Sequence, residues 1–357
     1  MSGRTLPPGR ARRGRPAGLA LTLLLLPALL VSGCADPGPE RPGRDPGGAG
    51  SAAPSRAGAS PAGAPDSPYW VDDRSDAARQ VAEWRAAGRN GDAEVLRRIS
   101  ERPMALWAPG DDPGPELRRA SAAAAAAGRT LVAVAYNIPY RDCGQHSAGG
   151  SADAAAYQRW IGAFADNLGT APAVVVLEPD AVPHVVDGCT QGEHHEERYA
   201  LLSEAVDRLK ARPRTKVYLD AGNPAWIPDP TKLVEPLRRA GVERADGFSL
   251  NVSNFQPDEA GRAYGGRLSK ALGGKHFVLD TSRNGDGPLP GSRDQAWCNP
   301  PGRALGKAPT DRTGDPLVDA YLWVKRPGES DGECRGGPAA GRWWPEYALG
   351  LARRARG

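Results

Sequence analysis

Six short apolar runs alternate with helix-like stretches, and this alternation limits the chain to α/β architectures more strictly than any other feature. The runs are LVAVAYN (131–137), AVVVLE (173–178), TKVYLD (215–220), GFSLN (247–251), HFVLD (276–280) and AYLWV (320–324). Strands that are almost continuously apolar are typical of parallel sheets covered by helices on both faces. The sequence therefore predicts a parallel α/β barrel, open or closed.

Helices are predicted in the stretches that separate these runs. They cover 76–88, 92–101, 114–127, 153–168, 193–211, 256–272 and 342–355, where helical periodicity or an alanine run favours them. A barrel of this type commonly uses about 250 residues as one unit. Residues 68–357 are therefore predicted to form a single domain of TIM-barrel-like architecture.

The first 33 residues have the features of an export signal. Five arginines precede the apolar run LALTLLLLPALLV, which is too short to span a bilayer comfortably. The run leads into VSGC, which resembles a bacterial lipobox and predicts that Cys34 is lipidated. An ordinary signal peptide with a chance cysteine is the alternative. We expect an extracytoplasmic protein, anchored to a membrane through Cys34 or secreted.

Composition separates a linker from the domain and argues against one class of partner. Residues 34–67 are dominated by Gly, Pro, Ala and Ser, so they are predicted to be a flexible linker. The formal charge of the chain is +4, but the signal contributes five arginines. The remaining chain has 41 basic and 42 acidic residues, a net charge of −1. Nucleic-acid binding therefore has no support in the composition.

Four cysteines remain once Cys34 is assigned to the lipid. An even number in an exported chain predicts two disulfides, but the sequence alone leaves three pairings open. A zinc site is the rival interpretation, and the lack of a CxxC pair argues against it. The GEHHEE segment at 192–197 indicates the start of a helix. The cysteines concerned are Cys143, Cys189, Cys298 and Cys334.

Polar residues gather at or just beyond the C-terminal ends of the apolar runs, where barrel enzymes keep their chemistry. Cleavage of a glycosidic bond needs opposed carboxyl groups of unequal pKa, and aspartates dominate this set. The pattern is typical of a carbohydrate-cleaving enzyme. The residues are Tyr136, Asp142, Asp180, Asp220, Asn251, Asp280 and Asp331.

Several motifs carry a resemblance to a known family. AYNIPYRDC followed by SAGG, VVVLEPDAV, VYLDAG with a following tryptophan, LNVSNF and WVKRPGESDG resemble, in order, the signatures of glycoside hydrolase family 6. The similarity covers about residues 68–357. It implies a distorted barrel of about seven parallel strands that cleaves β-1,4-glucan with inversion.

The resemblance also implies the catalytic roles. Asp180 in LEPD matches the general acid, and Asp142 in YRDC matches the carboxyl group that keeps this acid protonated. Asp331 in GESDG matches the proposed base, although proton removal through water, Asp142 and Ser147 is the alternative. Tyr136 matches the tyrosine that crowds the distorted sugar.

Substrate contacts follow from the same resemblance. Sugar rings stack on aromatic side chains, and the chain has nine tryptophans for four phenylalanines. Three of these tryptophans match platform positions of the family, and further polar residues match subsite contacts. The substrate-binding residues predicted in this way are Trp107, Asp220, Trp226, Asn251, Asn254, Trp297, Lys325 and Glu329.

The resemblance finally suggests the disulfide pairing, Cys143 with Cys189 and Cys298 with Cys334. Asn223 stands where family members often have a histidine. The segment after GESDG is short and implies an open cleft, which favours endo-cleavage of cellulose or a related β-glucan. We expect a monomer without cofactor or metal, because two carboxyl groups and water suffice.

Three alternatives stay open at this point. A cellobiohydrolase of the same family would share every motif. A surface lipoprotein that binds polysaccharide without cleaving it would have no use for an acid of raised pKa. A xylanase or chitinase of another barrel family would usually show paired glutamates at strand ends, where this chain has aspartates.

Overall fold

The computed structural model describes residues 67–291 and 295–356. The predicted signal, Cys34 and all but the last residue of the predicted linker lie outside the described residues. Among the helices that are described, none has both the length and the apolar character needed to cross a membrane.

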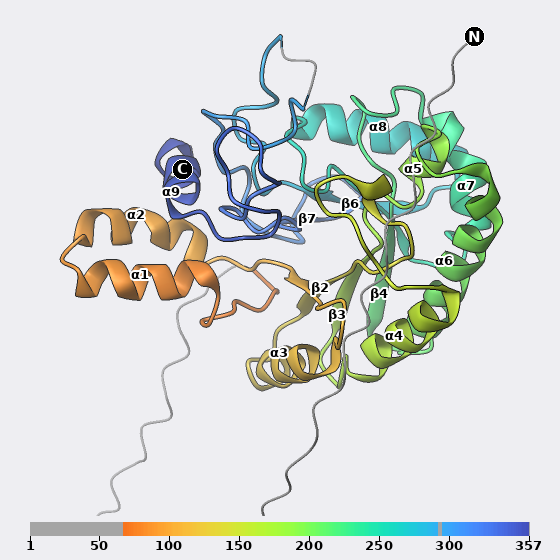
Figure 1. Ribbon diagram of the computed structural model, residues 1–357, viewed down its shortest axis with the longest axis horizontal. Helices are drawn as coiled ribbons and strands as arrows, with labels where there is room; N and C mark the ends of the chain where they lie inside the picture. Colours follow the sequence, from red (N-terminus) through yellow and green to blue (C-terminus); the bar gives the residue numbers. More distant parts are fainter. Residues whose placement is uncertain (1–66, 292–294, 357) are drawn as a thin grey trace, which may run out of the picture. The chain divides into compact units, whose positions relative to one another are not determined.

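Seven parallel strands form the sheet at the centre of the domain, in the order in which they occur along the chain (Figure 1). The segments beside the two edge strands approach each other, because Ala105 N donates a hydrogen bond to Trp323 O (2.9 Å). This arrangement confirms the predicted distorted parallel barrel of about seven strands. The strands are β1 (Leu106–Trp107), β2 (Leu131–Ala135), β3 (Ala173–Leu177), β4 (Thr215–Asp220), β5 (Gly247–Leu250), β6 (His276–Asp280) and β7 (Val318–Leu322).

Alternate residues of each strand supply two different cores. Val132, Val134, Val174, Val176 and Leu322 belong to one cluster of buried side chains, which also contains Tyr218 and Ala320. The residues between them, such as Ala133 and Val175, pack with the helices in a second cluster. Both faces of the sheet are therefore buried, which explains why the strand sequences are apolar throughout.

Helices cover the outer face of the sheet, and α3, α4, α6, α7 and α8 lie around the strands in Figure 1. Side-chain caps fix two of the helix starts: Ser75 accepts from Ala78 N at α1, and Asp153 accepts from Ala156 N at α4. The α-helices are α1 (Asp76–Ala86), α2 (Asn90–Ser100), α3 (Gly114–Ala126), α4 (Ala154–Asp166), α5 (Pro183–Val186), α6 (His195–Lys210), α7 (Val234–Arg239), α8 (Asp258–Ala271) and α9 (Pro345–Arg354).

Helices α1, α2 and α9 form a cluster of their own beside the end of β7. Leu96, Ile99, Trp84 and Leu351 are buried there together with Trp323, the residue that follows the strand. Asp92 Oδ1 of α2 forms a salt bridge with Arg353 Nη2 of α9 (2.6 Å). The N- and C-terminal parts of the described domain are thus packed against each other.

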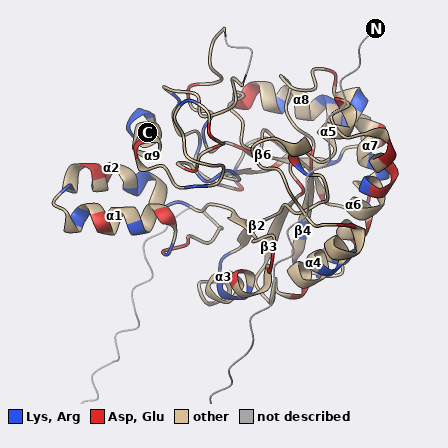
Figure 2. Cartoon of the chain, in the orientation of Figure 1, with Lys and Arg blue, Asp and Glu red and all other residues tan. Residues whose placement is uncertain are grey.

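Basic and acidic residues are interspersed along the outer helices, as the blue and red segments of Figure 2 show. Arg97 of α2, for example, pairs with Glu94 and Glu101 at helical spacing. Exposed pairs of this kind contribute little to the stability of the fold, because water and salt screen them. They support the helices locally and play no part in positioning the site.

All seven predicted helices and all six predicted strands are present, with boundaries that shift by a few residues. The last strand begins at Val318, two residues before the predicted start at Ala320. Four elements of the described chain were not predicted: the two-residue strand β1, the 3-10 turn Asp142–Gly144, the single-turn helix α5, and α7 with the 3-10 turn before it. Each is too short to show a hydrophobic period.

Candidate active site

A cavity of about 860 Å³ lies at the C-terminal ends of the strands. It has the size and position of a ligand site in a barrel enzyme. The structure brings together twelve of the residues that the sequence singled out: Trp107, Tyr136, Asp142, Ser147, Asp180, Asp220, Trp226, Asn254, Trp297, Lys325, Glu329 and Asp331.

Asp180 follows β3 in a sharply turned segment. Glu178 and Asp180 both have positive φ values, 45° and 70°, an unusual conformation that marks functional turns. Burial raises the pKa of the Asp180 carboxyl to about 7, and the charges of Asp220, Asp142 and Asp187 add to this effect, while His184 opposes it. This carboxyl group therefore stays protonated up to neutral pH, as a general acid requires.

Asp220 at the end of β4 lies next to Asp180. Its Oδ2 accepts hydrogen bonds from Asp180 N (3.0 Å) and Gly222 N (3.3 Å), and its Oδ1 accepts one from Ser249 Oγ (3.1 Å). Burial raises the pKa of Asp220 to about 6, although the hydrogen bonds oppose this shift. The two carboxyl groups titrate as a pair.

Asp142 lies in the loop that follows β2, within the 3-10 turn Asp142–Gly144. Its Oδ2 accepts a hydrogen bond from Ser147 N (2.6 Å). The root of the loop is held by Glu178, whose carboxylate accepts from the backbone N–H groups of Asn137 (2.9 and 3.0 Å) and Ile138 (3.0 Å). Glu178, two residues before Asp180, therefore fixes the loop that carries the Asp142 carboxyl group.

The predicted disulfides are both present, which confirms the pairing that the family resemblance implied. Cys143–Cys189 ties the Asp142 loop to the segment after α5. Cys298–Cys334 ties two loops that flank Asp331. Each bridge therefore restrains a wall of the cavity.

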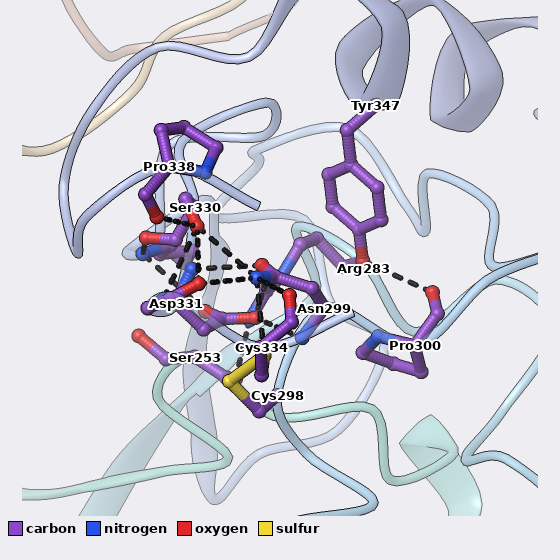
Figure 3. Close-up of a disulfide and its surroundings, with 12 residues drawn as sticks. Ser253, Arg283, Cys298, Asn299, Pro300, Ser330, Asp331, Cys334, Pro338 and Tyr347 are labelled. Atoms are coloured by element: carbon purple, nitrogen blue, oxygen red, sulfur yellow. Dashed lines mark hydrogen bonds and ion pairs between the residues drawn. A yellow bond between two sulfur atoms is a disulfide. The ribbon is translucent and has the colours of Figure 1, made fainter. Parts of the chain in front are cut away.

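Asp331 occupies a buried ion-pair network (Figure 3). Its Oδ2 accepts from Arg283 Nη1 (2.8 Å) and Asn299 N (2.9 Å), and Lys325 Nζ lies 3.4 Å from its Oδ1. Burial acts to raise the pKa of this carboxyl, but Arg283 and Lys325 outweigh burial and lower it. A carboxylate held ionised in this way is a weak proton acceptor.

Aromatic side chains line the cavity from several loops. Trp107 packs edge-on against Tyr136, with ring centroids 5.4 Å apart, and its Nε1 donates to Val324 O (2.8 Å). Trp226 Nε1 donates to Asp187 Oδ2 (2.8 Å). Burial and the charges of Asp180 and Asp142 raise the pKa of Tyr136 well above its usual range, so its hydroxyl group stays neutral.

The walls of the cavity touch at one place. An added Cβ on Gly332 would lie 2.5 Å from the ring of His146, so this histidine of the Asp142 loop packs directly on the residue after Asp331. His146 also packs edge-on against Trp297, with centroids 5.8 Å apart. The two walls of the cavity therefore make contact through His146, and the expectation of an open cleft stays a prediction.

The polar residues predicted to bind substrate divide into two groups. Lys325 Nζ donates to Ser330 O (3.1 Å), and Glu329 accepts from Arg326 (2.6 Å), so both are held in place at the cavity. Asn251 differs: its amide bonds to Asp280 O and to the backbone N–H of Gln256, and it is absent from the described lining. The structure gives Asn251 a role in holding a loop.

Asp142, Asp180 and His184 bring one donor atom each within 4.8 Å of one another, and this group could hold a metal ion. The same atoms are those that acid catalysis would use. No other feature of the described residues favours a cation there, so the sequence-based expectation of a metal-free enzyme stays a prediction.

Comparison with known proteins now adds an independent line of evidence. The model of the glycosyl hydrolases family 6 matches residues 64–355. The chain belongs to glycosyl hydrolase family 6. Its residues match Endoglucanase A of Cellulomonas fimi with 42% identity over 296 residues, 82% of this chain and 62% of that protein. Endoglucanase 1 of Streptomyces halstedii matches with 40% identity over 291 residues, 78% of this chain and 87% of that protein.

Solved structures of family 6 agree with the fold. The endoglucanase Cel6 of Mycobacterium tuberculosis, in complex with methyl-cellobiosyl-4-deoxy-4-thio-β-D-cellobioside, is 42% identical with a TM-score of 0.73. The match covers 81% of this chain and 97% of that one. The chain spans about 62% of the length of the Cellulomonas fimi relative.

Sequence reasoning missed several residues of this family-6 site. Arg283 is fully buried beside Asp331, and His184 and Asp187 line the cavity near Asp180. Glu178 belongs to the LEPD motif, but its backbone contacts were not foreseen. His184 and Asp187 follow that motif closely, so their proximity to Asp180 was the available signal. No sequence pattern pointed to Arg283, because its partner Asp331 is 48 residues away along the chain.

Proposed function

We propose that this protein is an endo-β-1,4-glucanase that hydrolyses cellulose or a related β-glucan with inversion. The observation that carries the proposal is Asp180, a carboxyl group with a pKa of about 7 at a cavity that is also lined by three tryptophans. Such a group donates a proton at neutral pH, and aromatic rings bind the apolar faces of glucose units. The endoglucanase names of the relatives from Cellulomonas fimi and Streptomyces halstedii support this proposal.

Asp180 would protonate the glycosidic oxygen while water attacks the anomeric carbon from the opposite face. Two carboxylates are candidates for taking the proton of this water. Asp331 is a weak base, because Arg283 and Lys325 hold it ionised. Asp142 lacks a paired arginine or lysine among the described ion pairs and lies on the loop with Ser147. One oxygen of Asp142 lies within 4.8 Å of one oxygen of Asp180, which is closer than the separation that admits the attacking water between two carboxyl groups. Asp142 would therefore take the proton through a chain of water beside Ser147, with Asp331 as a fixed negative charge that holds Lys325.

The mode of cleavage depends on the contact between His146 and Gly332. Endo-cleavage requires an internal segment of glucan to pass between the two walls, so this contact would open when the polymer binds. A cellobiohydrolase would instead keep the walls together. The wall contact thus gives the exo-acting alternative a specific structural basis, and the test below separates the two.

The test uses carboxymethyl cellulose, with viscosity and reducing ends measured together. An endoglucanase lowers the viscosity early for few new ends, whereas a cellobiohydrolase releases ends with little loss of viscosity. Asp180→Asn should abolish both signals, and kcat/KM should fall above a pH of about 7 as Asp180 ionises. Proton NMR of the first product from cellopentaose should show the α-anomer. A first product in the β-anomer would refute inversion, and binding of glucan without cleavage would refute the proposed hydrolytic activity.

We also propose an extracytoplasmic location with a lipid on Cys34. The two disulfides of the described domain support an oxidising compartment. Labelling of expressing cells with a clickable palmitate analogue tests the lipid, with Cys34→Ser as the unlabelled control. Equal labelling of both proteins would exclude Cys34 as the site, and export without any label would leave a secreted enzyme.

A further inference from the structure

His184 is a buried histidine at the active site whose side chain has no role in the acid step described above. It lies on the single-turn helix α5, only 6% of it is exposed, and it lines the cavity. Among the described residues neither ring nitrogen has a hydrogen-bond partner. A buried histidine with a purely structural role would normally have such a partner.

Three carboxyl groups surround this ring. Nε2 lies 3.9 Å from Asp142 Oδ1, and Nδ1 lies 3.5 Å from Asp187 Oδ2. A ring nitrogen and one oxygen each of Asp142 and Asp180 all lie within 4.8 Å of one another. The ring of Trp226 packs edge-on against the imidazole, with centroids 4.9 Å apart. The histidine thus lies close to both Asp180 and Asp142, the two carboxyl groups that exchange protons in the proposed function.

The backbone holds His184 at this place. Its N–H donates to Asp180 O (2.9 Å), and its carbonyl accepts from Thr190 N (2.8 Å). The Cys143–Cys189 disulfide joins the segment after α5 to the residue that follows Asp142. The backbone of His184 is therefore tied to Asp180 directly, and the disulfide ties the following segment to the Asp142 loop.

After each cycle of inverting hydrolysis, the general acid has lost a proton and the general base has gained one. Asp180 gives its proton to the departing glycosidic oxygen, the C–O bond breaks, and hydroxide from water joins the anomeric carbon. The second proton of that water goes to Asp142 in the proposed function. Asp180 is then ionised and Asp142 protonated, so one proton must return before the next bond is cut.

We propose that His184 relays this proton from Asp142 back to Asp180. The proposal rests on the proposed function. Neutral imidazole accepts the proton from Asp142, becomes imidazolium, and releases a proton to Asp180, so that no proton is gained or lost overall. The distances are longer than hydrogen bonds in the substrate-free protein, and catalytic contacts commonly tighten in complexes.

The charges around the ring suit this exchange. Burial alone would lower the pKa of His184, but Asp142, Asp180 and Asp187 together raise it. Asp187 Oδ2, which is partly exposed, faces Nδ1 and stabilises the imidazolium form. The three carboxyl groups therefore stabilise the imidazolium form that the ring adopts when it takes up the proton.

The decisive experiment compares single-turnover and multiple-turnover cleavage of cellopentaose by His184→Gln. The acid starts protonated, so a single turnover with excess enzyme should be within about twofold of the wild type. Multiple-turnover kcat at pH 7.5 should fall about tenfold or more, with little change in KM. Added imidazole should restore kcat of His184→Gly. His276→Gln is the matched control, because this histidine lies at the start of β6, away from the cavity.

Equal losses in single and multiple turnover would overturn the relay, as would a normal kcat or a failure of imidazole to rescue. Thermal melting establishes that each variant is folded, and His184→Asn replaces the glutamine variant if the latter is unstable. A chelator control with EDTA should leave the rates unchanged; loss of activity would indicate a metal at this group and also overturn the relay. If the wild type cleaves no glucan, the proposed function fails first.

Discussion

Replacing the acid by its neutral isostere should stabilise the protein at alkaline pH. In Asp180→Asn, asparagine tolerates the positive φ of 70° at this position, so the backbone is not strained. The wild-type carboxyl has a pKa of about 7 in the folded state and about 3.9 in an unfolded chain. A raised folded pKa contributes stability below pH 4 that is lost as the pH rises toward 7.

The two pKa values set the size of the effect. For an isolated group, the wild type would lose about 1.5 kcal/mol at pH 5 and about 4 kcal/mol at pH 8. Asparagine does not ionise, so it avoids this loss. Because solvent reaches part of Asp180 and the charge is shared with Asp220, screening reduces the difference. We expect the advantage of Asp180→Asn to grow by about 2 kcal/mol between pH 5 and pH 8.

Urea unfolding at both pH values, followed by tryptophan fluorescence under non-reducing conditions, measures this difference. Asp73→Asn is the matched control, because Asp73 is exposed and should show the same free energy of unfolding as the wild type at both pH values. An advantage of Asp180→Asn that is equal at pH 5 and pH 8 would refute the reasoning, since a gain from packing alone does not depend on pH.

Three other substitutions test separate parts of the site. Arg283→Met should lower the free energy of unfolding in urea by about 3–5 kcal/mol, because Asp331 keeps its charge without its buried partner. The exposed Arg238→Met should lower it by less than about 0.5 kcal/mol. Equal losses in the two variants would contradict a stabilising role for the Arg283–Asp331 ion pair. The Cys298→Ser/Cys334→Ser variant should lose about 4 kcal/mol, since the bridge closes a loop with a sequence separation of 36; an unchanged urea midpoint would show that this loop is already fixed. Trp226→Ala should raise KM for cellopentaose about tenfold with a smaller change in kcat; a lower kcat at unchanged KM would mean that Trp226 acts through Asp187 instead of holding sugar.

The sequence predicted those parts of the site that depend on strand periodicity. Asp180 and Asp220 directly end or follow buried strands, and parallel strands bring such ends to one edge. The position of Asp331 followed from a motif, but its ion pair did not, because Arg283 lies in a loop without any periodic signal. The loop contacts of Asn251 could not be predicted for a related reason: an asparagine at a strand end serves equally well to bind a ligand or to hold a loop, and only the partners of its amide decide.

Hydrogen bonds explain why the shared proton of the acid pair is held on Asp180. The two carboxyl groups are too close for both to ionise cheaply, so one stays protonated near neutral pH. Asp220 accepts from three described donors, the N–H groups of residues 180 and 222 and the hydroxyl of Ser249, and each donor stabilises the charged form. Among the described residues the Asp180 carboxyl group accepts no hydrogen bond, so the charge settles on Asp220 first, in agreement with pKa values of about 6 and about 7. The negative charge therefore stays on Asp220, and the proton stays on Asp180, the carboxyl group that we propose as the general acid.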